Sequence, residues 1–155
     1  MTSTMPIAIG LHLCSAVAWV GGMFFAHMVL RPAAIHVLEP PLRLLLWRRI
    51  FAGFFPWVWI SVIVLTVTGY WAVVADLGGL NQQFWHILLM QLIGIPMILV
   101  FLYIYFIPYQ DLKTAVVKQD WSGGGKQLST IRKLVGTNLI LGIGLVIIGS
   151  AGRYI

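Results

Sequence analysis

The chain has 155 residues, of which 60% are hydrophobic and only 9% are charged, whereas about 25% of the residues of an ordinary soluble domain are charged. Its 10 Lys and Arg side chains and 4 Asp and Glu side chains cannot cover a water-exposed surface. The composition therefore excludes a soluble enzyme, a disordered chain and a disulfide-stapled secreted domain. It predicts an integral membrane protein.

Four segments are apolar over the length that a membrane helix needs, which is about 20 residues. They are residues 5–30, 54–75, 84–108 and 134–152. We therefore expect a single domain, residues 1–155, of the all-α class. Its architecture is a bundle of four transmembrane helices, and its first partner is the lipid bilayer.

The basic residues are concentrated in two of the connections between these segments. The first connection holds Arg31, Arg43, Arg48 and Arg49, and the third holds Lys113, Lys118, Lys126, Arg132 and Lys133. By the positive-inside rule, both connections face the cytoplasm, and both termini face the periplasm of a bacterial-type inner membrane. Topology thus accounts for the net charge of +6, and we expect no nucleic-acid partner.

The two basic connections carry further structural signals. Pro40 and Pro41 precede a mixture of Leu, Trp and Arg that runs to Phe51, which predicts a short interfacial helix in the first cytoplasmic loop. Residues 109–121 predict a helical extension of the third segment. Three consecutive glycines at 123–125 predict a turn before the fourth segment.

Two histidines fall inside predicted spans, where a polar side chain is costly and needs a reason. His12 lies about two turns into the first segment, and His86 lies near the start of the third. Both segments begin on the outer side, so the two imidazoles reach a similar depth. Side chains on facing helices can jointly hold a metal ion or a haem iron at such a place.

The helical faces around these histidines are small or apolar. Trp19 shares a face with His12 on the first segment, and Met90 shares a face with His86 on the third. The fourth segment offers a smooth groove with a cation at its outer end, against which a flat ring would fit. This groove is formed by Asn138, Gly142, Gly149 and Arg153.

A haem b held between the first and third segments fits this pattern. The imidazoles of His12 and His86 would be the axial ligands, and Arg153 would pair with the propionates, together with polar side chains at 81–83. The residues predicted to contact the cofactor are His12, His86, Arg153, Trp19, Met90, Gly142, Gly149 and Asn138.

Two alternatives remain open at this point. Copper or another metal could be held by His12 and His86 together with methionine sulfurs. The same histidines could instead form hydrogen bonds between helices, with the glycines permitting close packing or contact with a second copy in a homodimer.

The remaining candidates add little chemistry. A second haem at His27 would need another ligand, and His36 is the only histidine available for it. Tyr105 and Tyr109 are expected in the aromatic belts of the membrane interface. Because no catalytic triad or buried carboxylate pair is evident, any reaction is expected to depend on a bound cofactor.

Several short motifs resemble those of the CopD/HemJ-like membrane proteins. This group joins copper-resistance protein D domains with the oxygen-independent protoporphyrinogen oxidase HemJ. The resemblance rests on Leu11-His12, Val17-Ala18-Trp19, Gly22-Met23-Phe24-Phe25, Trp85-His86, Arg132, Asn138 and Leu141-Gly142. It implies a four-helix membrane fold that often self-associates, with His12 as a haem or metal ligand.

The resemblance implies two kinds of function. HemJ-like proteins bind haem b and oxidise protoporphyrinogen, whereas CopD-like proteins are associated with copper movement. HemJ-like proteins carry a lysine soon after the histidine of the later helix, but Ile87, Leu88 and Leu89 follow His86 here. A pair of histidine ligands favours electron transfer over substrate binding at the iron.

We therefore predict a haem b-binding, cytochrome-like inner-membrane protein. It would act as an oxidoreductase, transferring electrons or oxidising a small porphyrinogen-like or quinone-linked substrate, with quinone or another redox protein as its partner. The alternative is a CopD-like protein that handles or transports copper.

Overall fold

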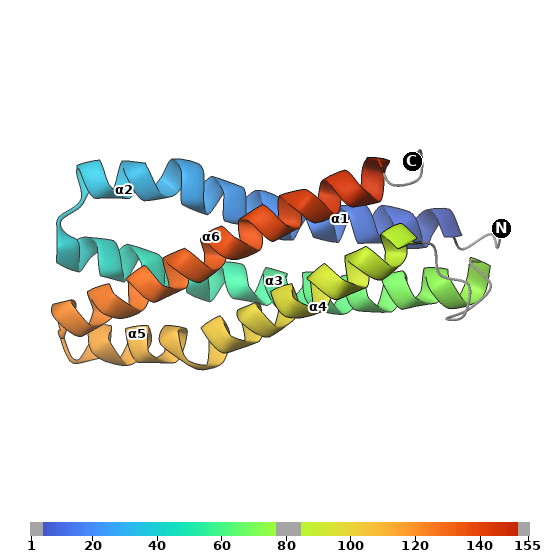
Figure 1. The fold of residues 1–155 in the computed structure, drawn as a ribbon. Helices are drawn as coiled ribbons and strands as arrows, with labels where there is room; N and C mark the ends of the chain where they lie inside the picture. The colour runs from blue at the N-terminus through green and yellow to red at the C-terminus, as the bar shows by residue number, and fades with distance from the viewer. Residues whose placement is uncertain (1–4, 77–84, 152–155) are drawn as a thin grey trace.

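The computed structural model describes residues 5–76 and 85–151, and every element in these ranges is helical (Figure 1). The chain runs back and forth through four long helical rods. The elements are α1 (Met5–Phe24), η1 (Phe25–Leu30), α2 (Arg31–Val37), α3 (Pro40–Asp76), α4 (Trp85–Phe106), α5 (Pro108–Val117) and α6 (Trp121–Ala151).

Four helical stretches are long and apolar enough to cross a membrane. They are Met5–Val37, Pro40–Val74, Ile87–Val117 and Trp121–Ala151. The predicted all-α fold with four candidate spans is therefore confirmed, and each stretch is longer than its predicted apolar segment. The assignment of the two ends to cytoplasm and periplasm stays a prediction from the distribution of charge.

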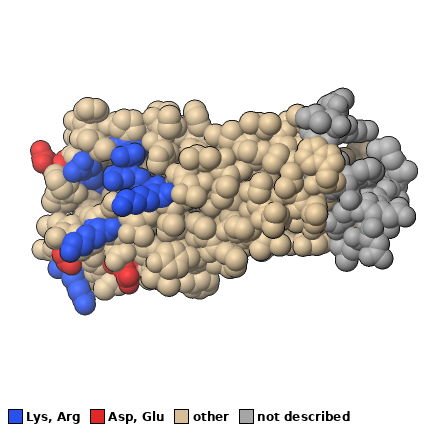
Figure 2. Space-filling model, viewed as in Figure 1, with Lys and Arg blue, Asp and Glu red and all other residues tan. Residues whose placement is uncertain are grey.

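Charged side chains gather at one end of the bundle (Figure 2). The α1–α3 connection and the α5–α6 turn lie at this end, whereas Met5 and Ala151 lie at the other (Figure 1). We call the first the basic end, because it carries the Lys and Arg residues of the two basic connections.

The predicted interfacial helix is not a separate element. Pro40 begins α3, which continues without interruption to Asp76 and contains Pro56 in its interior. The reason is a continuous buried stripe at intervals of three and four residues, the spacing of one helix face. This stripe consists of Leu44, Trp47, Phe51, Phe55, Val58 and Val62.

The predicted glycine turn is also wrong. The chain turns at residues 118–120 instead, where Gln119 has a positive φ of 57°, and the three glycines lie in the first turns of α6. Asp120 caps this helix, because its Oδ1 accepts a hydrogen bond from the Gly123 N–H at 2.8 Å. Gly124 is buried where α6 approaches Leu44 of α3 and Ala115 of α5.

An aromatic cluster fills the interior toward the basic end. The rings of Phe51 and Phe55 stack with centroids 5.1 Å apart, and Tyr109 meets Phe55 edge-on at 4.9 Å. Tyr109 is buried and Tyr105 is half-buried, so they pack in the bundle and do not form an exposed aromatic belt. This cluster joins α3 to α4 and α5, and thereby holds the basic end together.

Candidate functional site

His12 lies on the side of α1 that faces α3. Its imidazole is half-buried, and its Nδ1 atom lies 2.9 Å from the hydroxyl oxygen of Thr68. The ring also lies beside Gly69 of α3, where an added Cβ would be in ordinary contact with His12 Cε1 at 3.4 Å. The first predicted ligand is therefore held between two helices and is not directed into lipid.

The Thr68 hydroxyl determines which nitrogen of His12 carries the proton. Thr68 Oγ1 donates its only proton to the Val64 carbonyl oxygen at 2.6 Å. It must then accept a hydrogen bond from His12, so the imidazole proton resides on Nδ1. The lone pair is left on Nε2, the atom that is then available to a metal ion.

The same face of α1 carries further residues toward the bundle interior. Met5 and Trp19 precede and follow His12 by seven residues, and both are buried, as is Met23. The Trp19 ring meets Phe101 of α4 edge-on, with centroids 6.3 Å apart. A thioether sulfur, an imidazole and an indole thus lie along one inward stripe of α1.

The second predicted ligand, His86, belongs to the first turn of α4. α1 and α4 both begin at the end of the bundle opposite the basic end (Figure 1). The His86 side chain, Arg153 and residues 81–83 lie outside the described part of the structure. Joint ligation by His12 and His86, and the propionate contact of Arg153, therefore stay predictions.

The predicted groove on α6 is occupied by side chains of the bundle. A Cβ added at Gly142 would lie 2.9 Å from Val20 Cγ2 and 3.3 Å from Met97 Cε. At Gly149 it would lie 2.6 Å from Met90 Cε. Gly149 therefore packs against Met90 of α4, and Gly142 packs against Val20 of α1 and Met97 of α4. Contact of these residues with a cofactor stays a prediction.

Asn138 is buried beside this groove, with only 2% of its surface exposed. Its Nδ2 donates a hydrogen bond to the Met97 carbonyl oxygen at 3.0 Å, which ties α6 to α4. Its Oδ1 is buried and has no hydrogen-bond partner among the described residues. The side chain therefore fixes two helices and keeps one unused acceptor in the interior.

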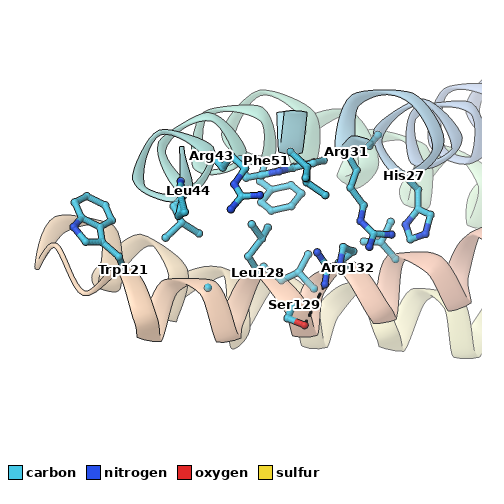
Figure 3. A pocket seen from close by; sticks show the side chains of 16 residues that line it. His27, Arg31, Arg43, Leu44, Phe51, Trp121, Leu128, Ser129 and Arg132 are labelled. Atoms are coloured by element: carbon cyan, nitrogen blue, oxygen red, sulfur yellow. Dashed lines mark hydrogen bonds between the residues drawn. The ribbon is translucent and has the colours of Figure 1, made fainter. Parts of the chain in front are cut away.

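The basic end contains a cavity of about 200 Å³ that the sequence does not predict (Figure 3). Four basic groups from four different elements line it: His27 of η1, Arg31 of α2, Arg43 of α3 and Arg132 of α6. The two basic connections converge here. The positive-inside rule accounts for their charge but does not predict that their side chains meet in one cavity. The four-residue spacing of His27 and Arg31 was the only local signal of such a site.

A second, apolar cavity of about 260 Å³ lies next to the first. The two share Ala26, Phe51 and Val135 as lining residues. Neither cavity is lined by His12, which lies 15 residues before His27, or about 22 Å along an α-helix. The structure thus separates the His12 region from the basic cavity.

Comparison with protein families shows to which family the chain belongs. The family model of copper resistance protein D, CopD, matches residues 48–151, about two thirds of the chain. The chain belongs to the CopD family. No curated protein and no solved structure matches it.

The CopD match covers most of α3 and all of α4, α5 and α6. It therefore includes Thr68, His86, Arg132 and Asn138, but not α1 with His12. The resemblance noted for the later helices is thus supported by the family match. The assignment of His12 as a ligand lies outside the matched residues and stays a prediction.

Proposed function

We propose that this CopD-family membrane protein binds and handles copper, with His12 Nε2 as a ligand nitrogen. The observation that carries the proposal is the chain of hydrogen bonds from His12 Nδ1 to Thr68 and from Thr68 to Val64. Such a partner on the second nitrogen fixes the tautomer and orientation of a metal-binding histidine. The name of the matching family, copper resistance protein D, points to the same metal.

The donor atoms suit Cu(I) better than a divalent ion. Imidazole nitrogen and thioether sulfur are neutral ligands, and thioether sulfur is a soft donor that selects Cu(I). Met5 lies on the stripe of His12, and the buried Met97 and the half-buried Met90 contact α6. Because a charge inside a membrane is costly, a monovalent ion with neutral ligands is the less expensive cargo.

The packing favours copper over haem b. A porphyrin lying on α6 would need flat space beside Gly142 and Gly149, where Val20, Met97 and Met90 already pack. A single metal ion needs no such space. We retain His86 as the second ligand in this proposal, since α4 begins at the same end of the bundle as α1.

Purified protein loaded anaerobically with Cu(I) tests the proposal. We expect stoichiometric copper in the wild type and its loss in His12→Ala and His86→Ala. His36→Ala is the matched control, because His36 is exposed on α2 and belongs to neither candidate site. Unchanged copper content in His12→Ala would contradict the proposal.

An absorption spectrum of the same preparations tests the haem hypothesis. A Soret band that shifts on reduction and is lost in His12→Ala would overturn the copper assignment in favour of a haem b cytochrome. Electron transfer to quinone or another redox partner would then become the function to examine. A colourless protein that binds Cu(I) supports copper handling.

A further inference from the structure

The cavity at the basic end has the features of an oxyanion site. Figure 3 shows Arg31, Arg43 and Arg132 directed into the space between α6 and the helices that face it. No acidic residue is among the described residues that line the cavity. Three guanidinium groups therefore share one cavity without a protein carboxylate to balance their charge.

Arg31 provides the most specific evidence for a missing partner. Its Nε atom is buried and has no hydrogen-bond partner among the described residues. Burying a polar donor without a partner costs free energy, because its hydrogen bonds to water are lost. A ligand oxygen in the cavity would remove this cost, and the planar guanidinium group suits a phosphate in particular.

The backbone around the cavity is arranged to bring these groups together. The π-helix η1 has a wider turn than an α-helix, and such segments are frequent at functional sites. It positions His27 against α6, where a Cβ added at Gly136 would lie only 3.1 Å from His27 Cε1. Ser129 adds a hydroxyl to the lining and accepts a hydrogen bond from Arg132 Nη2 at 3.5 Å.

The neighbouring apolar cavity indicates the kind of molecule that carries the phosphate. It adjoins the basic cavity at Ala26, Phe51 and Val135, and its other described lining residues are apolar except Asn138. A molecule with an anionic group and a hydrocarbon chain would match the two cavities, with the anionic group beside the arginines and the chain beside Phe51. Basic pockets between membrane helices bind the headgroups of anionic lipids in this way.

We propose that the basic cavity binds the phosphate group of an anionic phospholipid, with part of an acyl chain in the adjoining apolar cavity. Arg31 and Arg132 are the principal phosphate ligands, and Arg43 closes the cavity from α3. The site lies at the opposite end of the bundle from His12, so the proposal is independent of copper binding.

Native mass spectrometry of the whole protein in detergent tests this site. We expect phosphatidylglycerol to remain bound to the wild type, while zwitterionic phosphatidylcholine is lost, because its choline cation is repelled by the arginines. The double variant Arg31→Ala, Arg132→Ala should bind phosphatidylglycerol about tenfold to hundredfold more weakly, since two charged hydrogen-bond donors are removed. Equal retention of both lipids by the wild type would overturn the proposal.

Two exposed residues provide matched controls. Arg49 lies on α3 and Lys133 follows Arg132 on α6, and neither lines the cavity. Arg49→Ala, Lys133→Ala should retain phosphatidylglycerol, although the same net charge is removed. A general attraction of the basic end for anionic lipid would instead weaken binding equally in both double variants, and this result would refute a specific site.

Further measurements guard against misfolding and separate the sources of phosphate. Arg31→Lys keeps the charge but not the planar donor pair, so it should fold like the wild type and bind the lipid more weakly.

Glycerol 3-phosphate has the phosphate without the acyl chains and should not displace phosphatidylglycerol at equal concentration. Displacement by it would show that the cavity takes a soluble phosphate, which contradicts the lipid assignment.

Discussion

The Nδ1 atom of His12 lies 2.9 Å from the Thr68 hydroxyl oxygen, and this contact joins α1 to α3 in the half of the bundle away from the basic end. The hydroxyl cannot donate to His12, because its proton already binds the Val64 carbonyl oxygen. The contact therefore determines the chemical form of the imidazole as well as its position.

We expect Thr68→Val to lower the affinity for Cu(I) by about tenfold to hundredfold, because a metal-binding histidine loses the partner that orients it. Stability should change by only about 0.6 kcal/mol, the average for a hydrogen bond between membrane helices. Competition with a colorimetric Cu(I) chelator measures the affinity.

Thr66→Val is the control for this change. Thr66 makes the same kind of hydrogen bond, to the Val62 carbonyl oxygen at 2.7 Å, but it is exposed on α3. It should bind Cu(I) like the wild type. If both variants lost the same affinity for Cu(I), the loss would result from a change in α3 and not from the contact with His12.

Gly142→Ala should destabilise the protein by about 1–3 kcal/mol, the usual cost of overpacking a well-packed interior. Its Cβ would lie 2.9 Å from Val20 and 3.3 Å from Met97. Gly144→Ala on the same helix meets nothing within 4 Å and should be neutral or slightly stabilising. Thermal unfolding in detergent compares the two, and equal stability would refute the tight packing of α6.

Asp120→Ala should lower the free energy of unfolding by about 1 kcal/mol, because α6 loses the side chain that caps its first turn. Asp120→Asn keeps an acceptor oxygen and should retain most of that stability. Chemical denaturation in mild detergent measures the difference. A similar loss in the Asn variant would mean that charge, and not capping, is responsible.

Phe55→Ala should cost about 3–5 kcal/mol, as for other buried aromatic residues. Phe55 is only 4% exposed and contacts the rings of Phe51, Phe101 and Tyr109. Trp57 is a larger side chain two residues away, but it is 63% exposed. Trp57→Ala should therefore have a much smaller effect on thermal unfolding, and a comparable loss would contradict the assigned face of α3.

The sequence predicts the four spans because the requirement for about 20 apolar residues is strong. It does not predict that α3 is continuous, because the Arg residues between Leu44 and Phe51 suggest a helix at the interface. In the structure the apolar members of that run form one buried face, and the charges lie to its sides. Tertiary packing thus determines this element.

The candidate site is predictable only in part. A histidine in an apolar segment identifies His12, but its partner Thr68 is 56 residues away and carries no local signal. The basic cavity is hidden for a different reason. Arg31, Arg43 and Arg132 follow the charge distribution expected of any inner-membrane protein, so their convergence becomes visible only once the helices are packed.

Pro56 lies in the interior of α3, between the residues that this helix contributes to the two regions. Pro56 lies thirteen residues after Arg43 and twelve residues before Thr68, and proline weakens a helix at its own position by removing a backbone hydrogen bond. A bend there would move Arg43 and Thr68, which lie on either side of Pro56 in α3, relative to each other. If lipid and copper prefer different bends, each must alter the affinity of the other by the same factor.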